Sequence, residues 1–268
     1  MMGATGNMKT LLFILFLPFS LLAQQPQKML LNHPAVAKAA ASGPTNNTYG
    51  LVLWYTMDET TGTTLHDLSG NGNNATTSGV GVAGEITNGQ AFNGAMAAQT
   101  LGNVDLTTTA AVTVMFWFKS SSTSGIQFLL EDSVNANAHD AFCVDMNELS
   151  AGRLWVGDNG TVGFNDKQTS ATWADGNWHH FAWVINRDGV AADENTVYVD
   201  GQLQSLIAGY GLNAANTEKF DLQPIYLASR SASTLFYIGD LDDVRIYNRA
   251  LSASEITNQY QWPTGGRP

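Results

Sequence analysis

Residues 239–256 read GDLDDVRIYNRALSASEI, and the first nine of them have the character of a β-strand. Side chains alternate between the two faces of a strand, so strict alternation would place Leu241 on the face opposite Val244 and Ile246. All three become core residues if a β-bulge at Asp242 and its neighbour Asp243 shifts the alternation by one position. The stretch therefore predicts a long, bulged strand with two adjacent acids at the bulge.

The same stretch also predicts a helix, because Ser252 and Glu255 have the spacing of a capping box. No other window sustains a helical hydrophobic period, apart from a short Ala-rich patch near the N-terminus. Residues 112–119 are apolar on both faces, which is typical of a central strand covered on both sides. Asp200-Gly201 predicts a two-residue hairpin turn of type I′. The candidate strands are 51–57, 90–92, 112–119, 127–131, 142–146, 154–157, 179–186, 196–199, 225–228 and 237–247.

Four further motifs lie along the chain: GLVLWY at 50–55, DLSGNGN at 67–73, DGNWHHFA at 175–182 and VYVDG at 197–201. Together with the C-terminal stretch, and in the order in which the family has them, they resemble the laminin-G-like branch of the concanavalin A-like lectin/glucanase superfamily. The strand pattern and this resemblance predict an all-β fold, a two-sheet antiparallel jelly-roll β-sandwich over residues 49–262. In this fold the first and last strands lie near each other.

The composition excludes several classes of protein. The 268 residues carry a net charge of −11, which would repel a nucleic acid or an anionic membrane. Hydrophobic residues make up 44% and charged residues 13%, which excludes a disordered chain. Cys143 is the only cysteine, so an intramolecular disulfide or a thiolate zinc cluster is excluded.

The N-terminus has the pattern of a secretory signal peptide, here residues 1–23. Lys9 precedes an apolar run from Leu11 to Leu22 that ends at the small residue Ala23. A Pro- and Ala-rich linker is expected over 24–48 and a C-terminal tail over 263–268. No cysteine follows Ala23 directly, which excludes a lipoprotein anchor. We expect a secreted protein with no membrane insertion.

The loop at 67–74 predicts a site for a divalent cation, and its oxygen ligands favour calcium (Ca2+). It offers a carboxylate from Asp67, an amide oxygen from Asn71 and glycines that let backbone carbonyls turn inward. The resemblance implies that Asp242 of the acidic C-terminal strand supplies a second carboxylate, and that the ion clamps the two chain ends. The alternative is that Asp67 and Asn71 are ordinary turn residues and that Asp242 is a capping acceptor.

Carbohydrate recognition uses aromatic rings that stack on sugars and polar groups that bind hydroxyls. The candidates in loop-like sequence are Trp155, Asp158, Asn159, Trp173 and Tyr210. The alternatives are that the aromatic residues pack at the core or its edge, and that residues 158–160 form a plain hairpin.

Catalysis is not expected. The glucanases of the superfamily carry a Glu-x-Asp-x-x-Glu motif, and no glutamate of this chain has an aspartate two residues later. His179 and His180 are neighbours in a strand and face opposite sides, so we expect packing and hydrogen bonding from them.

The sequence therefore predicts a secreted, non-catalytic module that binds a glycan or glycoconjugate and holds structural calcium. The alternatives are an extracellular adhesion or assembly protein that binds protein partners, and a glycoside hydrolase.

Overall fold

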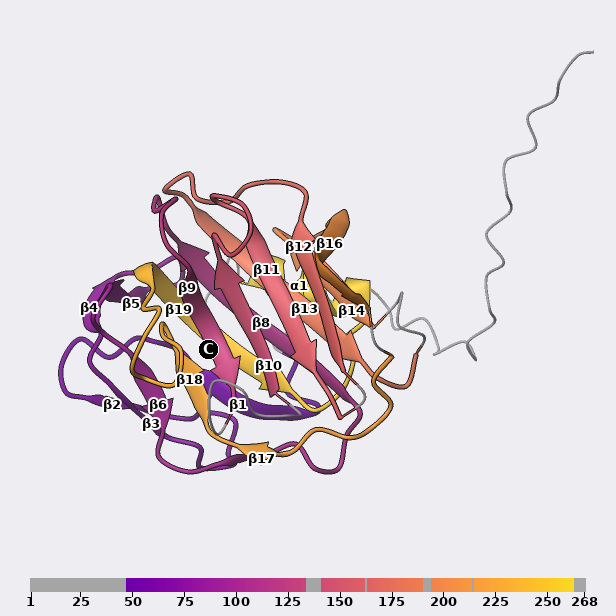
Figure 1. Cartoon of the computed structure of the whole chain (residues 1–268). Coiled ribbons are helices and arrows are strands. Elements are labelled where there is room, and N and C mark those ends of the chain that lie inside the picture. The colour runs from indigo at the N-terminus through magenta and orange to yellow at the C-terminus, as the bar shows by residue number, and fades with distance from the viewer. Residues whose placement is uncertain (1–46, 134–140, 162, 190–193, 214, 263–268) are drawn as a thin grey trace, which may run out of the picture. The chain divides into compact units, whose positions relative to one another are not determined.

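The structure, a computed structural model, describes residues 47–133, 141–161, 163–189, 194–213 and 215–262. The expected signal peptide (1–23), the C-terminal tail (263–268) and the linker up to residue 46 lie outside the described residues. Figure 1 shows the described part as two layers of strands.

The first layer, sheet A, has eight strands within the described residues. Its order is β15-β14-β13-β8-β19-β5-β4, and β1 also pairs with β19. The strands are β1 (Leu51–Tyr55), β4 (Val80–Ala83), β5 (Asn88–Asn93), β8 (Ala111–Lys119), β13 (Trp178–Asn186), β14 (Asn195–Val199), β15 (Gln202–Leu203) and β19 (Ile238–Tyr247).

The second layer, sheet B, has nine strands in the described part of the chain, in the order β16-β12-β11-β10-β9-β18-β6-β3-β2. The strands are β2 (Thr64–Leu65), β3 (Ala75–Thr77), β6 (Ala98–Thr100), β9 (Gln127–Asp132), β10 (Ala141–Met146), β11 (Leu154–Asn159), β12 (Phe164–Thr169), β16 (Leu206–Asn213) and β18 (Ile225–Leu227). A short pair, β7 (Val104–Asp105) and β17 (Leu222–Gln223), completes the strands.

Every pairing among these strands is antiparallel, so the predicted two-sheet antiparallel β-sandwich is confirmed. The first and last strands, β1 and β19, are hydrogen-bonded neighbours, as expected. The predicted hairpin turn is also present, because Asp200 and Gly201 both have positive φ between β14 and β15.

The predicted bulge lies in β19. The register of β19 against β8 shifts between Asp242 and Arg245, and Asp243 has φ +48°. Leu241, Val244 and Ile246 are all buried in the core, as the shifted alternation requires. The bulge thus turns Asp243 to the outer face, where it accepts hydrogen bonds from Trp54 and Arg245.

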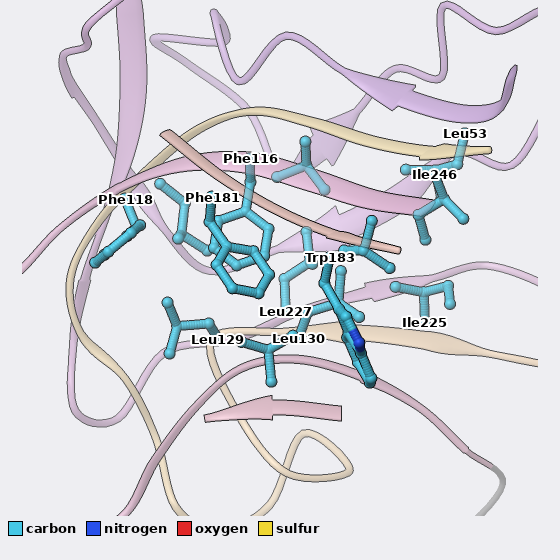
Figure 2. Close-up of a cluster of buried hydrophobic side chains, with 14 of the residues drawn as sticks. Leu53, Phe116, Phe118, Leu129, Leu130, Phe181, Trp183, Ile225, Leu227 and Ile246 are labelled. Carbon is cyan, nitrogen blue, oxygen red and sulfur yellow. The ribbon is translucent and has the colours of Figure 1, made fainter. Parts of the chain in front are cut away.

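Large aromatic and aliphatic side chains fill the space between the two sheets (Figure 2). Phe116 of β8 and Phe181 of β13 stack with ring centroids 4.9 Å apart. Trp183 meets Phe142 of sheet B edge-on, with centroids 6.0 Å apart, and so joins the two layers. Trp183 is fully buried, and its indole N–H donates to Asn195 at 2.8 Å.

The outer face of sheet A is covered by the helix α1 (Ala253–Gln261), which begins with the predicted capping box of Ser252 and Glu255. Its buried Ile256 and the following Trp262 pack on Trp54 and Met115 of the sheet. Arg245 is buried between Trp54 and Trp262. Since α1 is the single helix of the described residues, sheet B has no helix on its outer face there, and that face holds the candidate site.

Candidate functional site

The central strands of sheet B place a row of polar and aromatic side chains on its outer face. The pairing register puts Trp155 of β11 opposite Asp145 of β10 on one side and opposite Gln168 of β12 on the other. Paired residues share a face, and the intervening Val144 and Val156 belong to the core between the sheets. Asp145, Trp155 and Gln168 therefore all point away from the core.

Three aromatic rings gather at this point, from β11, β12 and β16. Trp155 stacks on Phe164 with centroids 5.5 Å apart and meets Tyr210 edge-on at 6.3 Å. We call Trp155, Phe164 and Tyr210 the aromatic cluster. Trp155 is 5% exposed and forms its floor, whereas Tyr210 is 57% exposed and stands at its rim.

Two glycines make room for this arrangement. A Cβ at Gly157 would lie 2.3 Å from the Trp155 ring, so the ring lies across the backbone of its own strand. A Cβ at Gly209 of β16 would lie 1.7 Å from Asp166 Oδ2 and 2.8 Å from the Trp155 indole nitrogen. Side chains at these positions would displace the ring or the carboxylate.

Polar groups surround the aromatic cluster. Asp166 Oδ2 accepts a hydrogen bond from the Trp155 indole N–H at 3.0 Å and another from the backbone N–H of Tyr210. The Tyr210 hydroxyl donates to Glu148, and this hydrogen bond raises the pKa of Tyr210 to about 12. Burial, reinforced by the nearby Glu148 carboxylate, raises the pKa of Asp145 well above its usual range. Asp145 therefore favours its neutral form, which both donates and accepts hydrogen bonds.

Several buried oxygens on this face have no partner among the described residues. They are both carboxyl oxygens of Asp145, Oδ1 of Asp166 and the amide oxygen of Gln168. All three side chains are at most 7% exposed. Each buried polar group without a hydrogen bond costs about 1–3 kcal/mol, so these oxygens make the layer beneath the aromatic cluster costly to fold.

The structure separates the five residues that the sequence predicted for carbohydrate binding. Trp155 and Tyr210 belong to the aromatic cluster, and Asn159 pairs with Phe164 on the same outer face. Trp173 lies elsewhere, half-buried beside the core with its ring 5.1 Å from that of His179. Asp158 faces the core side, fully buried, and its carboxylate pairs with Arg187 at 2.6 Å, apart from the aromatic cluster.

In the loop that was predicted to bind calcium, the side chains form hydrogen bonds within the loop and to the backbone of β1. Asp67 Oδ1 accepts from the backbone N–H of Trp54 at 3.0 Å and of Ser69 at 2.9 Å. Its Oδ2 accepts from the Ser69 hydroxyl and from the backbone N–H of Asn73, both at 2.8 Å. The Asn71 amide donates to the Leu51 carbonyl. These are the contacts of turn residues that anchor a loop.

Asp242 has a different neighbourhood. It is fully buried, and its Oδ2 accepts from the backbone N–H of Ile86 at 2.7 Å, at the turn between β4 and β5. Asp67 instead accepts from the backbone N–H of Trp54, which points away from β19. Asp67 therefore lies on the side of β1 that is opposite to β19. Within the described residues, no group of three or more His, Cys, Asp or Glu side chains is placed to hold a metal ion. A calcium shell shared by Asp67 and Asp242 does not fit these contacts.

The Asp67 contacts give a prediction for stability. Replacing Asp67 by alanine removes four hydrogen bonds to a partly exposed carboxylate, and we expect the free energy of unfolding to fall by about 1–2 kcal/mol. Urea titration measures this loss, with the exposed turn residue Asp188, replaced by asparagine, as the control. The loss should be equal with calcium and with EDTA; a loss seen only with calcium would support the calcium prediction.

Comparison with known protein families agrees with this architecture. Residues 92–257 match the Laminin_G_3 family, described as concanavalin A-like lectin/glucanases superfamily. The chain belongs to the concanavalin A-like lectin/glucanase superfamily. The matched residues of this superfamily member include the strands β9–β12 that carry most of the outer face.

Solved structures show the same fold at low sequence identity. Domain 4 of AbnA, a GH43 extracellular arabinanase from Geobacillus stearothermophilus solved with arabinotriose, has 18% identity and a TM-score of 0.59, covering 78% of this chain and 97% of that one. The binding domain of Paraclostridial Mosquitocidal Protein 1 has 19% identity and a TM-score of 0.58, covering 80% and 52%. The binding domain of botulinum neurotoxin DC, solved with rat synaptotagmin II, has 12% identity and a TM-score of 0.54, covering 81% and 52%.

This superfamily member thus spans about half the length of the toxin binding domains that it matches. A comparison of its sequence with curated proteins found no match. In the described part of the chain, no helix is both long and apolar enough to cross a membrane.

Sequence reasoning missed Asp145, Asp166 and Gln168 as site residues of this concanavalin A-like domain. Asp145 was inside a predicted strand but was not assigned a face. Asp166 and Gln168 lie in β12, which reads FNDKQT and was not predicted as a strand because it has few apolar residues. The alternation of Phe164, Asp166 and Gln168 is the signal that could have placed them on one face.

Proposed function

We propose that the protein is a secreted, non-catalytic module that binds carbohydrate on the outer face of sheet B. The observation that carries the proposal is the aromatic cluster, whose Tyr210 ring is 57% exposed and whose Tyr210 hydroxyl donates to the half-buried Glu148. Sugars suit such a site because their C–H faces stack on aromatic rings and their hydroxyls bind polar groups.

The solved structures support a role in binding. Domain 4 of the arabinanase was solved with arabinotriose, and the toxin structures are binding domains, one of them in complex with synaptotagmin. These likenesses concern the fold, so the choice of carbohydrate as the ligand rests on the chemistry of the outer face.

A binding role is also favoured over hydrolysis. A retaining glycosidase needs two carboxyl groups about 5 Å apart, one of them an ionised nucleophile. The Glu-x-Asp-x-x-Glu motif of the superfamily's glucanases is missing from the sequence. On the outer face, burial favours the neutral form of Asp145, which makes it a poor nucleophile.

The first test is a glycan array on the purified protein, read with wild type and with Tyr210→Ala. Tyr210 contributes the exposed ring of the aromatic cluster, and an aromatic contact is worth about 1–1.5 kcal/mol, so we expect the affinity to fall about tenfold. Tyr210→Phe keeps the ring and should bind nearly as well as wild type. The control is Tyr49→Ala, because Tyr49 is 79% exposed and its ring contacts Arg249 and no residue of the aromatic cluster.

Each result of the array has a meaning. Binding that falls in Tyr210→Ala and persists in Tyr49→Ala supports the proposed site. Equal binding by both variants would place recognition elsewhere on the protein. No glycan binding by a folded sample would overturn the carbohydrate proposal and favour a protein partner, and release of reducing ends would show a hydrolase.

Calcium remains a prediction from the residue types of loop 67–74. Running the array with calcium and again with EDTA shows whether binding depends on the ion. Binding that is lost with EDTA would make calcium part of recognition, whereas unchanged binding would leave it, at most, a structural role.

A further inference from the structure

The imidazole ring of His179 lies between two carboxylates that come from different parts of the chain. His179 belongs to β13 and is paired across the sheet with the core residue Phe118, so its ring points between the sheets. Its Nδ1 lies 2.8 Å from Asp200 Oδ2, and its Nε2 lies 3.1 Å from Asp175 Oδ1. Asp200 is in the turn between β14 and β15, and Asp175 is in the loop 170–177 that precedes β13. The ring therefore joins this loop to that turn.

Only the charged form of the ring makes both contacts as hydrogen bonds. A carboxylate accepts hydrogen bonds and donates none, so each ring nitrogen must carry a hydrogen to bind one. The imidazolium has two N–H groups, whereas the neutral imidazole has one N–H and one lone pair. In the neutral ring, this lone pair would face a carboxylate oxygen and repel it. The hydrogen bond to Asp200, with the charges of Asp200 and Asp175, raises the pKa of His179 above its ordinary value of 6.5.

The titratable groups around Asp200 are acidic as well. Glu85 lies in the turn between β4 and β5, and burial together with the charge of Asp200 raises its pKa. Burial, and then the charges of Asp200 and Glu85, raise the pKa of Tyr260 in α1. Release of the His179 proton would leave Asp200 between two other carboxylates, with no charge of opposite sign on the ring.

In the described part of the chain, the other elements around the ring supply no cation to replace it. Lys119 follows Phe118 in β8, so its side chain lies on the outer face of sheet A, where it pairs with Asp240 at 3.4 Å. His180 also points outward, and burial lowers its pKa to about 4, so it is neutral above about pH 6. The loop at 120–125, which is hydrogen-bonded to loop 170–177, has no charged side chain.

Loop 170–177 also contacts the loop that reaches the aromatic cluster. Trp173 meets the His179 ring edge-on, with centroids 5.1 Å apart, and its backbone N–H donates to the Gly152 carbonyl at 2.6 Å. Gly152 lies in loop 147–153, between β10 and β11. Glu148 of the same loop accepts the hydrogen bond from the Tyr210 hydroxyl. A movement of loop 170–177 is therefore passed on to the rim of the aromatic cluster.

We propose that His179 is a pH-sensitive clamp, whose imidazolium holds loop 170–177 against the β14–β15 turn and whose neutral form releases the loop. Through loop 147–153, the closed clamp also fixes Glu148 beside Tyr210, so the aromatic cluster binds its ligand more tightly. This second step rests on the proposed carbohydrate-binding function, whereas the clamp itself does not.

The direction of the pH effect follows from the two states of the ring. A histidine whose pKa is raised in the folded protein stabilises it fully below the unfolded pKa of 6.5. This contribution is lost as the pH rises above 6.5 and through the raised pKa. The clamp is therefore closed at mildly acidic pH and opens as the solution becomes alkaline.

The first test is an NMR titration of the full chain between about pH 5 and 9. We expect the His179 ring signals to titrate above 6.5, and the backbone amides of loop 170–177 and of Gly152 to shift with the same midpoint. Asp175→Asn removes the charge of one partner, so the His179 midpoint should fall. The Asp175 side chain is 52% exposed, so this variant should fold.

The second test compares His179→Gln with wild type, and the matched control is His66→Gln, because His66 is an exposed histidine outside the clamp. Glutamine cannot ionise, so His179→Gln should be less stable than wild type at about pH 6 and approach it as the pH rises. Urea titration measures this difference.

Calorimetry with linear arabinan, barley β-glucan and xylan measures the effect on binding. We expect wild type to lose about threefold in affinity between about pH 6 and 9. His179→Gln should bind with the weaker affinity at both pH values, and His66→Gln should follow wild type.

The outcomes separate the clamp from the carbohydrate-binding function. A His179 midpoint at or below 6.5, or loop amides that do not follow it, would overturn the clamp. A clamp that titrates while affinity stays constant with pH would overturn the link to the aromatic cluster. No binding of any of the three polysaccharides would overturn this link together with the proposed function, and the NMR titration would still decide the clamp.

Discussion

Replacing Asp158 by alanine is expected to lower the free energy of unfolding by about 3 kcal/mol, within the range for breaking one side of a buried ion pair. The Arg187 guanidinium is fully buried and binds both oxygens of Asp158, with its shortest contact at 2.6 Å. It also lies 3.9 Å from the centroid of the Phe220 ring. Without Asp158, this cation loses its shortest ion pair and keeps the more distant Glu218, at 4.0 Å, and the Lys219 carbonyl.

Urea titration of Asp158→Ala measures this loss, and Lys119→Ala is the control. Lys119 forms an ion pair with Asp240 at 3.4 Å, but its side chain is 40% exposed, so its loss should cost at most about 1 kcal/mol. Folded Asp158→Ala protein should still bind glycan like wild type, because Asp158 faces away from the outer face. Selective loss of binding in a stable variant would return Asp158 to the binding site.

Replacing Glu194 by glutamine is expected to flatten the pH dependence of stability. Burial, together with a hydrogen bond to Asp158, raises the pKa of Glu194 to about 7, and Asn216 donates to both carboxyl groups. The folded protein therefore holds this proton up to about pH 7, whereas the unfolded chain releases it near its ordinary pKa of 4.5. The stability from the raised pKa is fully present below pH 4.5 and is lost as the pH rises towards and through 7.

We expect wild type to lose about 2 kcal/mol from this group between pH 4.5 and 8, a value reduced because the proton is shared with Asp158. Glutamine cannot ionise, so the stability difference between Glu194→Gln and wild type should increase with pH over this window. Urea titrations at several pH values measure the difference. His180, whose pKa burial lowers to about 4, acts in the opposite direction but is present in both proteins and cancels. A constant difference would contradict the raised pKa.

The sequence predicts the fold well because its decisive signals are local. The bulge at Asp242 follows from three apolar residues that cannot share one face without it, and the capping box needs only Ser252 and Glu255. All ten predicted strands are present, with ends shifted by at most two residues. The short strands, such as β2 and β7, contain too few residues for any alternation to be visible.

The candidate site could be predicted only in part, because its residues meet through strand pairing. Trp155 and Tyr210 were predicted from their aromatic side chains, but their contact depends on β12 lying between β11 and β16. Asp145 and Gln168 flank Trp155 only in the observed register. Asp158 was predicted as a ligand from its residue type, whereas alternation from Trp155 through Val156 turns it towards the core.

The pairing of β1 with β19 has a mechanical consequence. The two strands are antiparallel, so the start of β1 and the end of β19 lie at the same end of the pair, where Leu51 is opposite Tyr247. A tensile load applied at residues 47 and 262 would first peel α1 from sheet A and would then break the β1–β19 hydrogen bonds one after another. Because the load falls on one hydrogen bond at a time, such a pair separates at lower force than strands that are sheared along their length. The outer face of sheet B contains neither strand and lies outside this load path.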